Sequence, residues 1–285
     1  MCSEQTTNNF TIITLSMGLT QDLKATLKSV NIQDRPVRHI LIDGSESEKT
    51  RMYCQRYFPA VEFYSQKPDG IYAAMNFGLE MIPGHSWVLF LNEGDFLLGR
   101  NAISNLIGNS PSPDYWCFGS TVAFELDTDR REIYGDESFN YKAFRKGKVL
   151  IPHPSTAIPA RWIKELHGFN PKFRIGADLD LIYRIFSSFG PPRYASHLVT
   201  AHQLGGISST SPFLSKLESL MIRIRNYPLD TIFAFTEKVT KLIRQTGKTL
   251  LDGTQAGNVS VHHVDKCKKK NSFPVCCRNK LLGYD

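Results

Sequence analysis

The run Phe10-Thr-Ile-Ile-Thr-Leu-Ser16 decides the fold of this chain, because it is a continuous apolar and β-branched stretch that ends in a polar residue. Such a run is typical of a strand buried on both faces of a parallel sheet. Strand patterns recur at 39–43, 61–64 and 87–91, and helix patterns lie between them at 20–30, 48–58 and 70–82. This alternation with short loops predicts right-handed βαβ crossovers and a mostly parallel sheet, which is an α/β fold.

Polar residues stand at the points where these predicted strands end. Ser16, Asp43 and Asp95 follow apolar strands, and Asp69 precedes the helix pattern at 70–82 as its predicted N-cap. In a parallel sheet, ligands bind beyond the carboxyl ends of the strands. We therefore expect these four residues to share one binding rim.

The remainder of the chain is less regular. Helices are predicted at 159–166 and 178–189, a tight turn at Gly205-Gly206, and basic amphipathic helices at 212–226 and 228–251. We predict a first domain over residues 1–210 and a basic helical extension over residues 211–285, with a loosely ordered tail.

Composition limits the class of protein. A chain of 285 residues with 41% hydrophobic and 21% charged residues has the make-up of a globular protein with a full core. We see no basic and apolar leader and no apolar run of the roughly 18–20 residues that would span a bilayer, so we expect a cytoplasmic protein. The six cysteines form no Cys-x-x-Cys pair; free thiols are expected, with zinc bound by the tail residues His262, His263, Cys267, Cys276 and Cys277 as the weaker alternative.

The net charge of +7 comes from residues 216–285, since residues 1–215 carry equal numbers of basic and acidic side chains. Residues 1–215 thus have no basic surplus, and we expect no nucleic-acid partner. The basic helices suit peripheral contact with an anionic membrane, at the inner face of the plasma membrane. The alternative is a helical appendage that packs on the core or forms a dimer.

The loop Asn92-Glu93-Gly94-Asp95 carries two carboxylates that follow an apolar strand. Carboxylates in such a loop are able to bind one hard cation such as Mg²⁺ or Mn²⁺, and a cation there neutralises a diphosphate leaving group. The alternative is a surface turn with solvated acids. Lys67, upstream of this loop, is able to pair with a phosphate.

Three motifs occur in a fixed order: Asp43-Gly44-Ser45, the run from Lys67-Pro68-Asp69-Gly70-Ile71-Tyr72 to Asn76-Phe77-Gly78, and Phe90-Leu91-Asn92-Glu93-Gly94-Asp95. Together they resemble the donor-binding half of the family 2 glycosyltransferases, and the bacterial enzymes of polysaccharide and colanic-acid-type synthesis in particular. His153-Pro154-Ser155-Thr156, Gly168-Phe169-Asn170, Gly176-Ala177-Asp178-Leu179-Asp180 and Gly205-Gly206-Ile207-Ser208 resemble the acceptor side of that family. The resemblance covers about residues 10–210.

This resemblance implies a GT-A (Rossmann-like) fold and an inverting transfer of a sugar from a nucleotide-sugar donor to a hydroxyl of a glycan or lipid-linked acceptor. Asp43 would bind the nucleobase, Asp69 would lie near the base and ribose, Asp95 would bind Mn²⁺ or Mg²⁺, and Asp178 would be the general base. A carboxylate in that position takes the proton of the attacking hydroxyl. The remaining predicted site residues are Ser16, Lys67, Asn76 and Glu93 for the donor and His202 for the metal or diphosphate.

The sequence departs from the family at two places. Asn92 and Glu93 stand where the metal loop often begins with an aspartate, and Ala73 stands where the family often has an acid. If the segment is helical, Asp180 points away from Asp178, and we predict a structural pair with Arg184. His153 is either a packed core residue or a site residue, and Asn76 is either a donor ligand or polar filling.

Two alternatives belong to other functional classes. A sugar-nucleotide pyrophosphorylase would need a glycine-rich basic loop after the first strand, whereas Ser16-Met17-Gly18-Leu19-Thr20 has one glycine and no base. A non-catalytic glycosyltransferase-like protein that binds a glycan or a partner remains open because of the irregular metal loop.

Overall fold

The computed structural model describes residues 9–45, 47–67, 69–108, 113–125, 130–135, 139–204 and 211–253. The tight turn predicted at Gly205-Gly206, the family signature through Ser208 and the cysteines and histidines of the tail lie outside these residues. The strands are β1 (Phe10–Ser16), β2 (Arg38–Asp43), β3 (Glu62–Ser65), β4 (Trp87–Phe90), β5 (Asp95–Leu97), β6 (Cys117–Phe124), β7 (Arg131–Tyr134), β8 (Thr156–Pro159) and β9 (Arg193–Gln203). The helices are α1 (Gln21–Asn31), α2 (Glu48–Tyr57), α3 (Ile71–Glu80), α4 (Ala102–Ile107), α5 (Tyr141–Arg145), η1 (His153–Ser155), α6 (Ala160–Glu165), α7 (Ala177–Phe189), α9 (Pro212–Asn226) and α10 (Pro228–Gly253).

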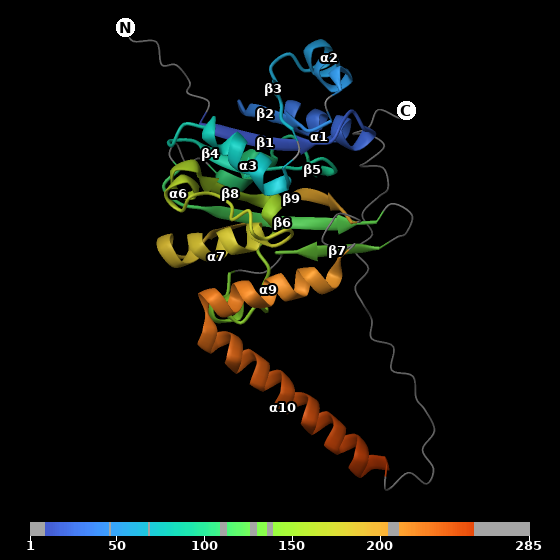
Figure 1. Cartoon of the computed structure of the whole chain (residues 1–285), viewed down its shortest axis with the longest axis vertical. Helices are drawn as coiled ribbons and strands as arrows, with labels where there is room; N and C mark the ends of the chain where they lie inside the picture. Colours follow the sequence, from blue (N-terminus) through green and yellow to red (C-terminus); the bar gives the residue numbers. More distant parts are fainter. Residues whose placement is uncertain are drawn as a thin grey trace.

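One continuous sheet runs through the molecule in the order β3-β2-β1-β4-β8-β6-β9-β5, with β7 paired to β6 (Figure 1). The first four of these strands are parallel, as the alternating pattern predicts. Beyond β4 the pairing is mixed, since β4–β8, β6–β8 and β5–β9 are antiparallel while β6–β9 is parallel. The α/β class is confirmed, and the parallel arrangement holds for the N-terminal half of the sheet.

Alternate side chains of the inner strands enter two different cores, because successive residues of a strand point to opposite faces. Ile13 and Ile42 pack with α3, α6 and α7 on one face. Ile12 and Leu89 pack with α4 and the end of α1 on the other face. At Gly78 of α3, a Cβ atom would lie 2.8 Å from the Cδ1 atom of Ile42, so this glycine lets the helix approach the sheet closely.

The helices α1 and α3 begin with different kinds of cap. Thr20 is the N-cap of α1, and its hydroxyl accepts a hydrogen bond from the amide of Leu23 at 3.0 Å. The prediction that Asp69 caps α3 is wrong: Gly70 is the N-cap, and no side chain caps this end. Gly70 has a φ of 90°, a backbone conformation that glycine adopts without the steric penalty of a Cβ atom.

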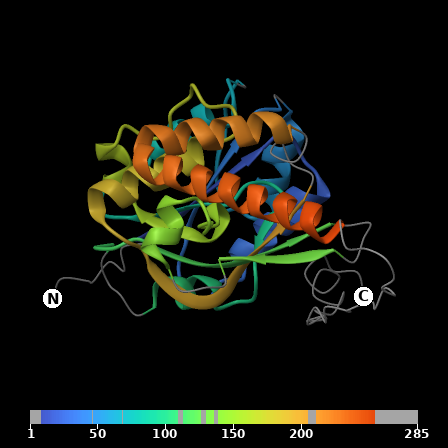
Figure 2. The same cartoon turned by 90° about the horizontal axis from the view of Figure 1, so that it is seen from below.

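The C-terminal helices lie along one side of the molecule. Figure 1 shows α9 below α7 and the sheet, and α10 running away from the body of the protein, while Figure 2 shows both helices from below. Ile222 of α9 is completely buried in the same core as α7, and Glu218 is buried beside it. None of the helices in the described part of the chain is both long and apolar enough to cross a bilayer.

Candidate active site

A cleft of about 700 Å³ opens at the loop that follows β4. Of the four residues predicted to share one binding rim, Asp95 lines this cleft, and Ser16, Asp43 and Asp69 do not. Asn92, Glu93 and Asp95 line it from the loop after β4, and His202 lines it from the end of β9. Asp178 contributes from the first turn of α7. The predicted metal residues and the predicted base, which are far apart in the sequence, therefore lie in one cavity.

Asp43 closes the end of β2 beside Ser16, with which it is in register on the neighbouring strand. Its Oδ1 atom accepts a hydrogen bond from the Ser16 hydroxyl at 3.0 Å, and its Oδ2 atom accepts one from the Ser45 hydroxyl at 2.7 Å. The Asp43 residue is only 1% exposed. Both carboxylate oxygens of Asp43 therefore have a hydroxyl partner within the protein.

Glu93 connects the loop after β4 to the start of α1. Its carboxylate accepts hydrogen bonds from the Thr20 hydroxyl and, at 3.3 Å, from the Met17 amide. Both partners belong to the loop that follows β1. Glu93 therefore holds two strand-end loops together and borders the cleft at the same time.

Asp95 and His202 form a pair at the centre of the cleft. The Nδ1 atom of His202 lies 2.6 Å from the Oδ1 atom of Asp95, and the two residues face each other across the antiparallel β5–β9 pair. Burial lowers the pKa of His202, but the hydrogen bond and the charge of Asp95 outweigh this effect, and the net pKa is raised. The pairing of β5 with β9 brings together a carboxylate and an imidazole 107 residues apart in the chain.

We tested whether these residues fit the divalent cation that the resemblance implies. Among the residues that the structure describes, no group of three or more His, Cys, Asp or Glu side chains forms a complete metal site. Mg²⁺ and Mn²⁺ in nucleotide enzymes commonly take only one or two protein carboxylates, with phosphate oxygens and waters as the other ligands. Asn92 offers an additional oxygen, because its buried Oδ1 atom has no hydrogen-bond partner in the described structure. The residues present thus fit a cation that the protein and a diphosphate would share.

Asp178 is held by a tyrosine that the sequence analysis did not single out. The Tyr72 hydroxyl, from α3, lies 3.2 Å from the Oδ1 atom of Asp178 and also donates to the carbonyl oxygen of Ile175. Burial and the nearby charge of Asp178 raise the pKa of Tyr72 well above its usual range, so Tyr72 stays a protonated donor. The position of Tyr72 within the Asp69–Asn76 motif was the signal in the sequence that could have identified it.

The carboxylate of Glu218, on α9, binds the three backbone amides that precede Asp178. It accepts hydrogen bonds from Arg174, Ile175 and Gly176 at 2.8–2.9 Å. These amides belong to the loop just before α7 and to its N-cap Gly176, and the buried carboxylate satisfies their hydrogen-bond donors. No local pattern links residue 218 to residues 174–176, and the sequence analysis missed this contact.

Asp180 and His153 have mainly structural surroundings. Asp180 is completely buried, and its Oδ2 atom accepts a 2.7 Å hydrogen bond from Arg184, which confirms the predicted i,i+4 pair. His153 borders the cleft, and its ring stacks on Phe90 with the ring centroids 5.6 Å apart. Burial lowers the pKa of His153, although the charges of Asp178 and Asp95 act against this shift.

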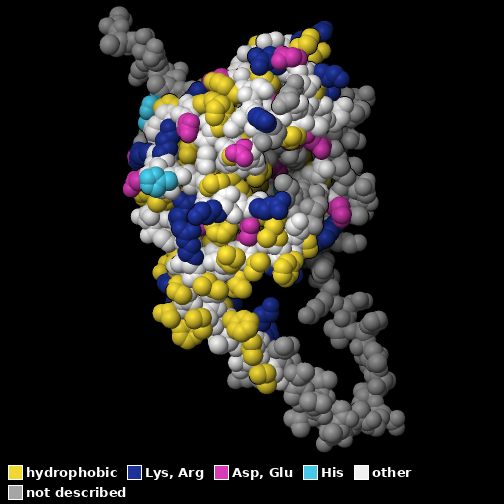
Figure 3. Space-filling view, in the orientation of Figure 1, with side chains coloured by type: hydrophobic (Ala, Val, Ile, Leu, Met, Phe, Trp, Pro, Cys, Tyr) yellow, Lys and Arg dark blue, Asp and Glu magenta, His cyan; other side chains and the backbone are white. Residues whose placement is uncertain are grey.

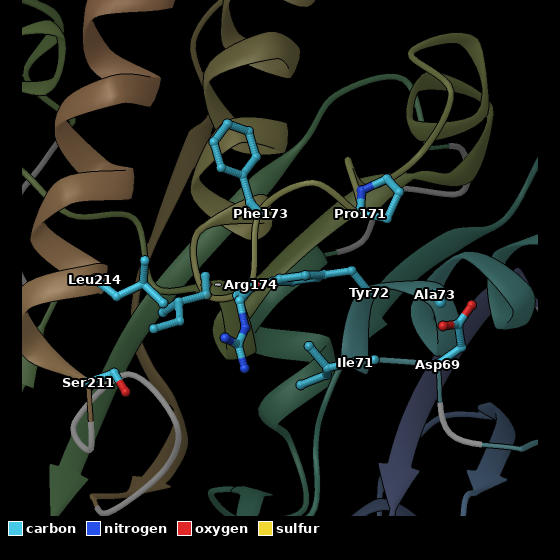
Figure 4. Close-up of a pocket in the computed structure, with 11 residues that line it drawn as sticks. Asp69, Ile71, Tyr72, Ala73, Pro171, Phe173, Arg174, Ser211 and Leu214 are labelled. Atoms are coloured by element: carbon cyan, nitrogen blue, oxygen red, sulfur yellow. Dashed lines mark hydrogen bonds between the residues drawn. The ribbon is translucent and has the colours of Figure 1, made fainter.

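Of the predicted donor ligands, Glu93 borders the main cleft, whereas Ser16, Asp43, Lys67, Asp69 and Asn76 do not. Lys67 is exposed in the loop before α3. Asn76 uses its side-chain amide for two hydrogen bonds with the backbone of Phe169, at 2.8 Å and 2.9 Å, so its observed role is to join α3 to the loop after α6. Asp69 is exposed and borders a second cavity of about 380 Å³ (Figure 4).

This second cavity adjoins the cleft, because Ile71, Tyr72, Arg174 and Ile175 border both. Its other walls come from the loop that carries Pro171 and Phe173 and from the start of α9, which contributes Ser211 and Leu214 (Figure 4). The wall is largely apolar. Tyr72 thus stands between the cleft that holds the candidate catalytic groups and the second cavity beside α9.

Solved structures with a similar architecture identify the fold of this chain. The crystal structure of S. aureus TarS 1–349 matches with a TM-score of 0.56 and 12% sequence identity, over 79% of this chain and 68% of that chain. The mannosyltransferase PcManGT from Pyrobaculum calidifontis, in complex with GDP-Man and Mn²⁺, matches with a TM-score of 0.56 and 14% identity, over 88% of this chain and 76% of that chain. The chain has the GT-A glycosyltransferase fold.

A third GT-A structure, GalNAc-T7 with UDP, GalNAc and Mn²⁺, matches with a TM-score of 0.52 and 13% identity, over 70% of this chain and 44% of that chain. No family model matches the chain, and no curated protein matches it. At these identities the GT-A likeness concerns the fold. The chemistry of this chain must therefore be argued from its own cleft.

Proposed function

We propose that this GT-A protein is an inverting, metal-dependent glycosyltransferase of the family 2 type that transfers a sugar from a nucleotide-diphosphate-sugar donor to a hydroxyl of a glycan or lipid-linked acceptor. The observation that carries the proposal is that Asp178 and the Asp95–His202 pair line the same cleft in a GT-A fold. The three comparison proteins include complexes with GDP-Man and with UDP. A role in bacterial polysaccharide synthesis follows from the resemblance in sequence.

Asp178 acts as the general base in this proposal. The acceptor hydroxyl loses its proton to the Asp178 carboxylate while its oxygen attacks the anomeric carbon, and the bond from that carbon to the nucleoside diphosphate breaks. One displacement of this kind inverts the configuration of the sugar. Tyr72 donates a hydrogen bond to the Asp178 carboxylate and fixes the direction of its lone pairs.

The diphosphate end of the donor would lie against Asp95, His202 and Asn92. A divalent cation held there by these side chains supplies charge neutralisation for the departing diphosphate. Ser16 and Asp43, at the ends of β1 and β2, are proposed to bind the nucleobase. Lys67, Asp69, Asn76 and Glu93 stay predictions as donor-binding residues, and the contacts of Asn76 and Glu93 favour a positioning role for both.

A donor screen tests this proposal. The purified chain is incubated with UDP-, GDP- and dTDP-sugars, with Mn²⁺ or Mg²⁺ and membrane lipid extract as the acceptor source, and the release of nucleoside diphosphate is followed. We expect metal-dependent release from one donor, which Asp95→Ala abolishes. Asp178→Asn is expected to retain donor binding in calorimetry and to lose turnover.

Asp114→Asn is the matched control, because Asp114 is an exposed carboxylate that pairs with Arg161 and does not border the cleft. This variant is expected to keep full activity. If no donor binds and none is turned over under any of these conditions, the proposal is wrong. The result would then favour a non-catalytic glycan- or partner-binding protein that has kept the GT-A fold.

A further inference from the structure

The two C-terminal helices expose far more apolar surface than the rest of the described structure. Eleven large hydrophobic side chains between residues 213 and 243 are exposed, with exposed fractions from 38% to 80%. They are Phe213, Leu217, Leu220, Met221, Ile224, Leu229, Ile232, Phe233, Phe235, Val239 and Ile243. Figure 3 shows hydrophobic side chains gathered over α9 and the adjoining part of α10. Contiguous apolar surface on this scale marks an interaction site.

These side chains form one stripe along each helix. On α9 they recur at 213, 217, 220, 221 and 224, and on α10 at 229, 232, 233, 239 and 243, with Phe235 at the edge of the α10 stripe. Spacings of three and four residues place side chains on a single face of a helix. The opposite face of α9 carries the buried Ile222 and Glu218, so the helix already packs on the protein core with its other side.

The acidic side chains of these helices point away from the apolar face. Glu218 is buried against the loop before α7, and Asp230 pairs with Arg145 at 2.5 Å. Glu237 pairs with Lys146 and Lys148 of the same segment. The described side chains of residues 211–243 include no other Asp or Glu. The outer face is therefore apolar and free of negative charge in this range.

Basic side chains flank the stripes. Lys216 and Arg225 are exposed on α9, and Lys238 and Lys241 are exposed on α10. A helix with an apolar stripe and basic flanks lies in the interface of an anionic bilayer, with its apolar side chains among the acyl chains and its cations at the headgroups. A protein partner would have to match both the apolar stripe and the basic flanks along the two helices.

We propose that the apolar face of α9 and α10 docks on the surface of an anionic lipid bilayer. Leu214, next to the 80%-exposed Phe213, borders the apolar cavity beside Tyr72, so the docked face begins at the edge of that cavity. A lipid-linked acceptor in the bilayer would then lie beside Asp178. This placement of the acceptor rests on the proposed function, whereas binding to lipid does not.

Sedimentation with vesicles tests the docking of the full chain. Vesicles of phosphatidylcholine with phosphatidylglycerol are compared with phosphatidylcholine alone, at low and high salt. We expect the chain to sediment with the anionic vesicles, and high salt to weaken this binding. The double variant Phe213→Gln/Phe233→Gln is expected to bind anionic vesicles weaker by on the order of tenfold or more, because two aromatic anchors are removed.

The matched control is Met52→Gln/Tyr57→Gln, which removes two exposed large apolar side chains from α2 and is expected to bind like the parent chain. Both double variants should have the melting temperature of the parent chain and, without lipid, its rate of donor hydrolysis. These two measurements distinguish a failure of lipid docking from a failure of the proposed catalysis. Equal sedimentation of the parent chain and the Phe variant would overturn the proposal. A dimer that light scattering detects and that the Phe substitutions dissociate would also overturn the proposal, because the apolar face would then bind a second copy of this chain.

Discussion

The contact between Glu218 and the start of α7 yields the sharpest prediction from this structure. Its carboxylate accepts three backbone hydrogen bonds and is only 6% exposed. In Glu218→Gln one oxygen becomes an NH₂ group that faces backbone N–H donors, so one or two of the three bonds are lost. With about 1.5–3 kcal/mol for each bond to a charged group, we expect the free energy of unfolding to fall by about 1.5–6 kcal/mol.

For a chain of this size, that loss corresponds to a fall in melting temperature of about 3–10 °C, measurable by calorimetry. The clamped residues Arg174–Gly176 precede Asp178 and supply the Ile175 carbonyl that holds Tyr72. We therefore expect kcat to fall about tenfold or more while the KM for the donor changes little, because displacement of a catalytic group affects the chemical step.

Glu237→Gln is the control for this prediction. It makes the same substitution on the adjoining helix, where Glu237 forms exposed ion pairs with Lys146 and Lys148. Such pairs contribute little to stability, and the melting temperature is expected to stay the same. The reasoning is refuted if Glu218→Gln has the melting temperature and the kcat of the parent chain.

Three other predictions follow from buried groups. Burial lowers the pKa of His39 from 6.5 to about 4. Between these two pH values His39 is protonated in the unfolded chain and neutral in the folded chain, so the free energy of unfolding decreases as the pH falls from about 6.5 toward 4. Denaturant unfolding should show a loss of about 2 kcal/mol from about pH 7.5 to about pH 5, and a flatter dependence in His39→Gln. Gly78→Ala should destabilise the protein by about 1–3 kcal/mol despite the better helix propensity of alanine, because the new methyl group meets Ile42 at 2.8 Å; an unchanged denaturation midpoint would contradict this. Tyr72→Phe removes a hydrogen bond to Asp178, and kcat should fall about tenfold with little change in the KM for the donor; an unchanged kcat would count against a positioning role for Tyr72.

The rim of strand-end residues could be predicted because it depends only on local pattern. An apolar, β-branched run predicts a buried strand, and a polar residue after it must lie at the carboxyl edge of the sheet. Ser16 and Asp43 are indeed hydrogen-bonded at that edge, and Asp95 lies at the cleft. The functional assignment of Asp178 came from the resemblance and not from periodicity.

The second half of the sheet could not be predicted in the same way. The partners of β6 are β7, β8 and β9, and the first and last of these lie on opposite sides of α6 and α7 in the sequence. Such pairing depends on which edges remain free once the helices are packed, and residue patterns within one strand do not contain that information. The cap predicted at Asp69 failed for a local reason, since Gly70 takes a positive φ that moves the helix start by one residue.

The sequence by itself determined the parallel N-terminal half of the sheet, the strand-end acids and the amphipathic character of the C-terminal helices, because each follows from a short-range period of two or of about 3.6 residues. Only the tertiary structure decided that His202 meets Asp95, that Tyr72 holds Asp178, and that Glu218 binds the amides before α7. These contacts join residues 42 to 107 positions apart, and only the packing of the complete chain brings such residues together.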